Sequence, residues 1–74
     1  MTPNALALAL RVPSNRIYAI IEGNRGISAE TALRLARYFG TSAEFWMNLQ
    51  LRYDLETERH KSEEDIVKMV QPRP

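Results

Sequence analysis

The feature that most constrains this chain is the placement of its prolines and glycines, which divide it into helix-length intervals. Both residue types disfavour helix interiors, and the intervals between them contain few β-branched runs, so we predict an all-α fold. Residues 5–10 alternate with a period of two, as a strand would, but the alternating partner of leucine is alanine, a strong helix former, and we predict a helix there. The dividing residues are Pro3, Pro13, Gly23, Gly26, Gly40, Pro72 and Pro74.

We expect four or five short helices within this frame. The first has Thr2 as its N-cap and Pro3 at its first position, where the missing N–H costs nothing. The second runs from about Ser14 to Glu22, and Gly23 ends it. Its isoleucines have the i, i+3, i+4 spacing of one buried stripe: Ile17, Ile20 and Ile21.

The third predicted helix is the best defined. Ser28 caps its start, Gly40 stands where a left-handed residue ends a helix, and Glu30 pairs with Arg34 at i,i+4 on the outer face. The residues expected on its inner face are Ala32, Leu35, Ala36 and Phe39.

A fourth helix is predicted to begin at Ser42 and to run to about Glu56. Its expected inner face consists of Phe45, Trp46, Leu49 and Tyr53. The run Ser62-Glu63-Glu64-Asp65 has the spacing of a capping box and indicates a short fifth helix before Pro72. Residues 56–61 either continue the fourth helix or form a loop. We therefore divide the chain into a domain of residues 1–56 and a charged tail of residues 57–74.

Length and composition exclude several classes of protein. The chain has 74 residues and no cysteine, so it forms one domain without disulfides or thiolate zinc. His60 has no second histidine to share a metal, and we find no nucleophile and no phosphate-binding glycine loop, so we predict no enzyme, cofactor or metal. No run approaches the ~18 apolar residues of a membrane span, and we expect a cytoplasmic protein. A core this small supplies roughly 3–5 kcal/mol, which favours a homodimer.

The formal net charge of +1 conceals an uneven distribution. Residues 1–43 contain five arginines, no lysine and two glutamates, whereas residues 44–74 contain five basic and seven acidic residues. A basic front half suits a phosphate backbone, and an acidic tail suits a basic partner or simply solubility.

The first two predicted helices are joined by only a few residues, so they must cross steeply. A steep crossing requires a small residue at the approach, and Ala7 supplies it. This is the spacing of a helix-turn-helix, whose second helix enters the DNA major groove. Arg11 occupies the turn position that usually belongs to glycine, at a cost of about 1 kcal/mol if the left-handed conformation is kept. The apolar residues that converge on the crossing are Leu6, Leu10, Val12, Ile17 and Ile20.

Four runs of sequence carry a family resemblance. They are Asn4-Ala5-Leu6-Ala7, Val12-Pro13-Ser14-Asn15-Arg16-Ile17, the long run from Ile21 to Ser42, and Phe45-Trp46-Met47-Asn48-Leu49-Gln50. Together, over residues 2–56, they resemble the HigA/VapI-type antitoxins of the Xre helix-turn-helix class, with a lambda-repressor-like fold. The resemblance implies a bacterial dimeric repressor of its own operon that neutralises a HigB-like mRNA-cleaving toxin.

Two departures from that family stand out. Its members usually carry a further helix before the helix-turn-helix, whereas this chain begins almost at it. The position after Thr2, often a glutamine that touches phosphate, is Pro3 here, and that contact is lost.

The second helix can be oriented from its periodicity alone. Burying its isoleucines turns Asn15, Ala19 and Glu22 outward and leaves Arg16 and Tyr18 on the flanks. Asn15 can then bond an adenine edge, and Arg16 can reach guanine or phosphate. Ala19 can meet a thymine methyl group. Tyr18 either contacts the DNA backbone or covers the turn.

The loop after this helix adds contacts without sequence preference. Asn24 and Arg25 lie between glycines, and the free amides of Ser28 and Ala29 open a helix, an arrangement that favours phosphate. The predicted DNA-binding set is Thr2, Asn4, Ser14, Asn15, Arg16, Tyr18, Ala19, Asn24, Arg25 and Ser28.

Other interpretations stay open. The chain can be a solitary Xre-type repressor without a toxin, or a helical adaptor that binds only protein and keeps the helix-turn-helix as scaffold. Phe45 and Trp46 belong to the core or to a dimer or toxin contact. The acidic run from Asp54 to Asp65 is either a solvated surface or an attraction for a basic toxin.

Overall fold

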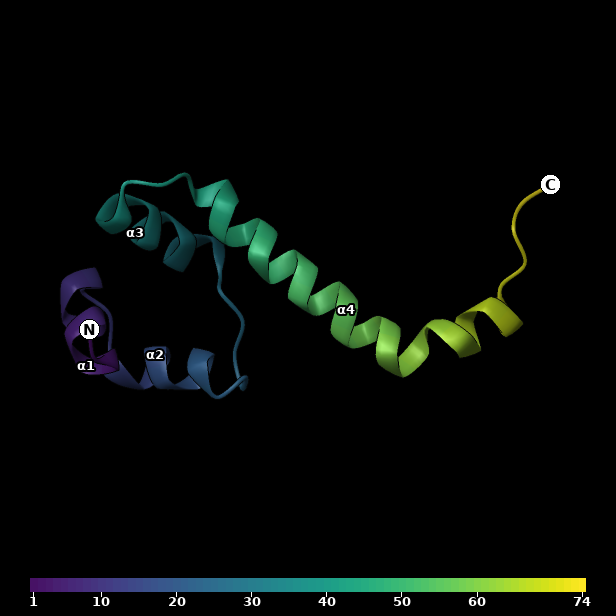
Figure 1. The fold of residues 1–74 in the computed structure, drawn as a ribbon, viewed down its shortest axis with the longest axis horizontal. Coiled ribbons are helices and arrows are strands. Elements are labelled where there is room, and N and C mark those ends of the chain that lie inside the picture. The colour runs from purple at the N-terminus through teal and green to yellow at the C-terminus, as the bar shows by residue number, and fades with distance from the viewer.

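The computed structural model describes residues 1–74 and contains helices only. The first three helices form a small head, and the fourth leaves it as a long arm (Figure 1). The all-α prediction is confirmed, although one of the four helices is not short. Their bounds are α1 Pro3–Leu10, α2 Ser14–Ile21, α3 Ala29–Phe39 and α4 Ala43–Met69.

Three helices begin at the predicted hydroxyl residues. In each, the side-chain oxygen accepts a backbone N–H three residues later and satisfies one of the amides that a helix start leaves free. α2 begins after Pro13 with no side-chain cap. The capping pairs are Thr2 with Ala5, Ser28 with Thr31 and Ser42 with Phe45.

Left-handed residues end the first three helical segments. Arg11 (φ 60°), Gly23 (φ 79°) and Gly40 (φ 71°) adopt this conformation. After each of them, the next N–H reaches back five residues, as from Val12 to the carbonyl of Ala7 at 3.0 Å. This is the bond that defines a Schellman motif. The left-handed conformation, which the sequence left open at Arg11, is therefore kept without a glycine.

The core lies where α1, α2 and α3 meet. Ala7, Leu10, Ile17 and Leu35 form it, and Ala7 fills the predicted small position with 2% of its surface exposed. Ala32 and Thr31 of α3 are also buried. The half-buried residues packed against this core are Leu6, Val12, Ile27 and Trp46.

Several residues predicted to face inward do not. Phe39, Phe45 and Leu49 are each about half exposed, and Tyr53 is 60% exposed. Only the first turns of α4 pack on α3. The helical spacing of Phe45, Leu49 and Tyr53 therefore identifies an apolar face of α4 but does not say what covers it. Trp46 does pack against the core of the head, and its Nε1 donates to Thr41 Oγ1 in the α3–α4 connection at 2.7 Å.

α4 is one uninterrupted helix of 27 residues, about 40 Å long. The separate fifth helix is therefore wrong, and residues 56–61 continue the fourth. Ser62 lies inside the helix, where its hydroxyl donates to Glu58 instead of capping a new start. The segment has no glycine or proline and is rich in helix formers, so nothing interrupts it. The division at residue 56 stays a prediction, since α4 crosses it without a break.

The chain is elongated for its length. It measures 51 × 23 × 16 Å with a Cα radius of gyration of 16.2 Å. A compact domain of this size has a radius of about 11 Å. The excess comes from the arm, since every residue from 51 to 70 except Ser62 is exposed. No helix, α4 included, has an apolar stretch that could cross a bilayer.

Candidate DNA-binding surface

The first turn of α2 carries Asn15, the residue predicted to bond an adenine edge. Ser14 and Asn15 are exposed, while Ile17, two residues later, is 4% exposed and anchors the helix in the core. Tyr18 is 40% exposed on the same open side. Asn15 is thus accessible on a helix whose opposite face is fixed.

The end of α2 is less buried than predicted. Ile20 is half-buried and Ile21 is 62% exposed, so the expected three-isoleucine stripe is wrong at its last member. The last turn of α2 extends beyond the α1–α3 core, which leaves Ile21 without a covering side chain. Ala19, expected to point directly outward, is half-buried.

Arg16 does not protrude as expected. Its side chain is 24% exposed, and Nη1 lies 3.4 Å from Oε1 of Glu30 on α3. Its Nε is buried without a hydrogen-bond partner. The prediction that Arg16 is free to reach guanine or phosphate is therefore wrong for the unbound chain: the guanidinium lies between α2 and α3, because the Glu30 carboxylate at the start of α3 attracts it.

Glu30 also holds the arginine with which it was predicted to pair. Arg34 Nε is 3.4 Å from the same Oε1, and Arg34 Nη1 donates to the carbonyl of Leu10 at 3.0 Å. This carbonyl belongs to the last turn of α1, where helices leave acceptors free. One carboxylate and one arginine therefore connect α1, α2 and α3.

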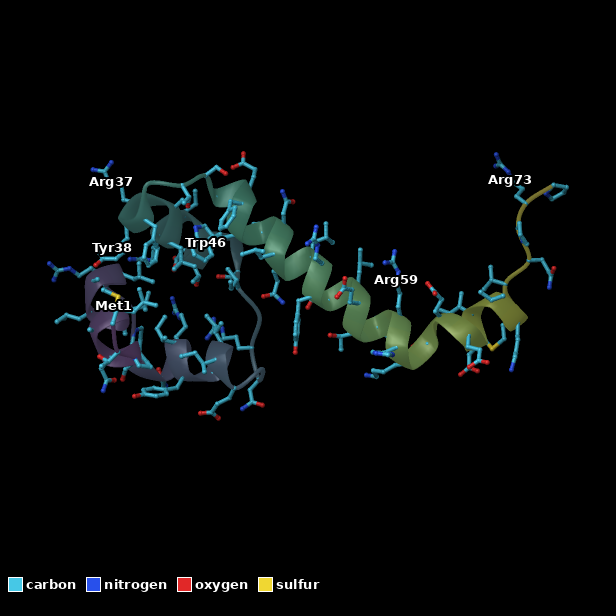
Figure 2. The ribbon with its side chains drawn as sticks, in the orientation of Figure 1. Met1, Arg37, Tyr38, Trp46, Arg59 and Arg73 are labelled. Carbon is cyan, nitrogen blue, oxygen red and sulfur yellow. The ribbon has the colours of Figure 1, made fainter.

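The arginines of the head differ in whether an ion pair already engages their charge. Arg16 and Arg34 are paired, whereas Arg11, Arg25 and Arg37 are exposed and form no ion pair. Arg37 lies on the side of the head away from α2 (Figure 2). Among the three exposed arginines, Arg25 is the one that follows α2 directly.

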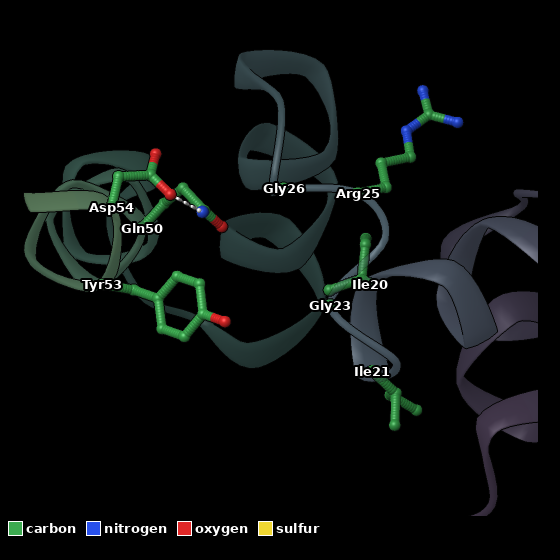
Figure 3. A pocket seen from close by; sticks show the side chains of 8 residues that line it. All are labelled: Ile20, Ile21, Gly23, Arg25, Gly26, Gln50, Tyr53 and Asp54. Atoms are coloured by element: carbon green, nitrogen blue, oxygen red, sulfur yellow. Dashed lines mark hydrogen bonds between the residues drawn. The ribbon is translucent and has the colours of Figure 1, made fainter. Parts of the chain in front are cut away.

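The loop after α2 carries two further predicted residues, Asn24 and Arg25. Asn24 N–H is bonded to the carbonyl of Ala19 at 2.9 Å, and its side-chain Nδ2 lies 3.5 Å from Glu22 Oε2. Arg25 is exposed, and its side chain extends away from α4 (Figure 3).

The start of α3 has the expected arrangement. Ser28 Oγ accepts the Thr31 N–H at 3.2 Å, while the backbone amides of Ser28 and Ala29 bond to no group of the chain. Thr2 and Asn4 are exposed at the start of α1, where the Thr2 hydroxyl is engaged in capping.

Sequence reasoning assigned no site role to Gln50, although it lies in the quoted Phe-Trp run. Its Oε1 accepts the Ile27 N–H at 2.8 Å, and its Nε2 donates to Asp54 Oδ1 at 2.8 Å. Ile27 and Gln50 are 23 residues apart, so no local sequence pattern reveals the bond between them. Gln50 lines an open cleft of about 370 Å³ between the α2 end, the loop and α4 (Figure 3). No group of three or more histidines and carboxylates is placed to hold a metal ion.

A helix-turn-helix family model, HTH_3, matches residues 1–46. The chain belongs to this family. Virulence-associated protein I of Dichelobacter nodosus is 47% identical over 68 residues, which make up 90% of this chain and 63% of that protein. The chain thus spans less than two thirds of this relative's length.

Solved structures agree with the family assignment. A HigA-family addiction module antidote protein from Coxiella burnetii is 51% identical, with a TM-score of 0.94 over 99% of this chain and 79% of that one. The antitoxin HigA of Pseudomonas aeruginosa, solved with the higBA promoter, is 45% identical, with a TM-score of 0.92 over 99% and 79%. The resemblance to HigA/VapI-type antitoxins is confirmed, and these relatives are regulators and antitoxins, not enzymes.

Proposed function

We propose that this chain binds operator DNA through α2 and the loop that follows it. The observation that carries the proposal is the exposed start of α2, with Asn15 accessible and Ile17 buried behind it. The fold is that of an antitoxin solved with its promoter. An asparagine at the start of a groove-entering helix can bond an adenine edge with both its amide groups.

The neighbouring residues have supporting roles. Ala19 contacts a thymine methyl group when α2 lies deep in the major groove. Tyr18 lies where its hydroxyl can meet the DNA backbone. Arg16 is held by Glu30 and steadies the first turn of α2; it contacts DNA only if that pair opens.

A second set of residues fixes the position of the protein on the duplex. Exposed Arg25 supplies a positive charge, and the unbonded amides at the start of α3 supply donors for phosphate. These contacts give affinity that depends on salt but not on sequence. The further members of this set are Thr2, Asn4, Ser14, Asn24 and Ser28.

Dimerisation is part of the proposal. The arm exposes Leu55, Ile66, Val67 and Met69, each at least 45% accessible, and nothing in the chain covers them. A second arm packed on this face would bury them. A two-fold dimer also reads two half-sites about one helical turn apart, which multiplies affinity and selectivity.

The antitoxin role extends the proposal to a protein partner. A HigA-family relative is an addiction module antidote protein, and we propose a HigB-like mRNA-cleaving toxin as the partner of this chain. Repression of its own operon is the proposed regulatory outcome. Both remain proposals for the whole protein, because the chain spans only part of its curated relatives. The acidic arm, with Glu56, Glu58 and Glu63 exposed, is complementary to a basic RNA-binding protein.

Fluorescence anisotropy with a fragment of the chain's own promoter tests DNA binding. We expect Asn15→Ala to lower affinity for the promoter about tenfold or more while leaving binding to a scrambled fragment unchanged. Asn48→Ala, which changes an exposed asparagine on α4, is the matched control. Absent binding would favour the protein-only adaptor, and binding that does not depend on Asn15 would refute the assignment of α2 as the reading helix.

Co-expression tests the toxin partner. If a small basic open reading frame adjoins the gene, its product should arrest growth alone, and this chain should restore growth and co-purify with it. A chain that represses its promoter but has no such neighbour would be a solitary repressor.

A further inference from the structure

Gln50 connects α4 to the loop that carries the proposed phosphate contacts. Its Oε1 accepts the Ile27 N–H at 2.8 Å in a part-buried position. Between Asn24 N–H, bonded to Ala19, and the cap of α3, the loop backbone makes no other hydrogen bond. The Ile27 side chain packs against the core, and the Gln50 bond is the only hydrogen bond that joins this stretch of the loop backbone to α4.

Asp54 determines which way the Gln50 amide points. Its Oδ1 accepts from Gln50 Nε2 at 2.8 Å, one helical turn along α4. A carboxylate attracts the NH2 end of the amide and repels the carbonyl end, so the oxygen is turned toward the Ile27 N–H. Figure 3 shows the Gln50–Asp54 bond on the side of the cleft formed by α4.

The loop passes close to Gln50 because of Gly26. A Cβ added at Gly26 would lie 3.0 Å from Gln50 Nε2 and 3.1 Å from Cδ. The amide thus fills the space beside the glycine. The fit links two segments that are 23 residues apart in the chain.

From these contacts we infer that Gln50 is a positioning residue for DNA binding. It holds the Asn24–Arg25 loop in the position from which Arg25 contacts a DNA phosphate. Asp54 acts through Gln50 by fixing its amide. The inference rests on the proposed function, because it requires that the loop contact DNA. Gln50 itself lies on α4 and is not proposed to touch the duplex.

The first test is Gln50→Leu, with Asn48→Leu as the matched control on an exposed position of α4. Losing one hydrogen bond that orders the loop should weaken promoter binding about threefold to tenfold. The slope of log affinity against log salt should shrink by up to about 0.9, the value of one phosphate contact. In an Arg25→Ala background, Gln50→Leu should add almost nothing.

The second test reverses the polarity of the pair. Gln50→Glu alone places two carboxylates one turn apart, and their repulsion should turn the new carboxylate away from Asp54 and weaken binding relative to the wild type. Combining it with Asp54→Asn restores a donor to the pair and the wild-type net charge, while the carboxylate introduced by Gln50→Glu can still accept the Ile27 N–H. The double variant should therefore recover the wild-type salt slope.

Hydrogen exchange at the Ile27 amide makes the test independent of DNA. Exchange should quicken in Gln50→Leu and slow again in the double variant, with melting temperatures showing that each variant folds. Gln50→Leu with wild-type affinity and slope, or with losses that add to those of Arg25→Ala, would overturn the inference. Wild-type protein that does not bind its promoter would instead refute the proposed function.

Discussion

The conformation of Arg11 gives a stability prediction with a known sign. At φ 60° and ψ 44°, this residue is the only non-glycine with positive φ. A side chain in the left-handed region costs roughly 1–2 kcal/mol, because Cβ crowds the backbone. Glycine avoids this cost but loses more entropy on folding, by about 0.5–1 kcal/mol relative to alanine. Arg11→Gly should therefore stabilise the protein by about 0.5–1 kcal/mol.

The structure indicates that little else changes with this substitution. The Arg11 side chain is exposed and forms no ion pair or hydrogen bond, and its backbone N–H already bonds to the Leu8 carbonyl at 3.2 Å. Gly23 and Gly40 show the same turn with glycine in place. The left-handed turn itself is thus compatible with the new residue.

Thermal unfolding followed by circular dichroism measures the effect. For a domain this small, 1 kcal/mol corresponds to about 4–8 °C in melting temperature. Arg11→Ala is the matched control, because it removes the same charge and keeps the Cβ atom. Protein concentrations must be equal, since dimerisation raises the melting temperature. If Arg11→Gly melts no higher than Arg11→Ala, the reasoning about backbone strain is refuted.

Two further predictions concern caps and the arm. Ser28→Ala should lower the free energy of unfolding by about 1 kcal/mol, since it removes the bond to the Thr31 N–H that caps α3. Ser62→Ala, inside α4, should change it by less than about half of that. Equal losses in urea titrations would contradict the assignment of Ser28 as a cap and Ser62 as a helix-interior residue. Replacing Ile66 and Val67 with aspartate should give a monomer in sedimentation experiments, and an unchanged dimer would exclude this face of the arm.

Local chemistry was predictable from the sequence. The caps at Thr2, Ser28 and Ser42 and the turn at Gly40 each depend on residues within one helical turn, and all four were correctly placed. Arg11 was identified as the residue at the turn position that usually belongs to glycine, and the structure shows that it adopts the left-handed conformation.

Long-range relations were not predictable in the same way. Arg16 looked exposed because its partner, Glu30, is 14 residues away on another helix. The apolar faces of Phe45 and Tyr53 were found by periodicity, but periodicity does not say whether this chain or another one covers them. The same limit applies to Gln50, whose contact with Ile27 requires the arrangement of α4 against the loop.

The most direct test of the central claim is a titration of the protein with its promoter fragment, followed by amide chemical shifts. We predict that the largest changes fall on residues 14–19 and 24–29 and that the arm beyond residue 56 responds little. Changes concentrated on the arm, with Asn15 and Arg25 unaffected, would contradict the account.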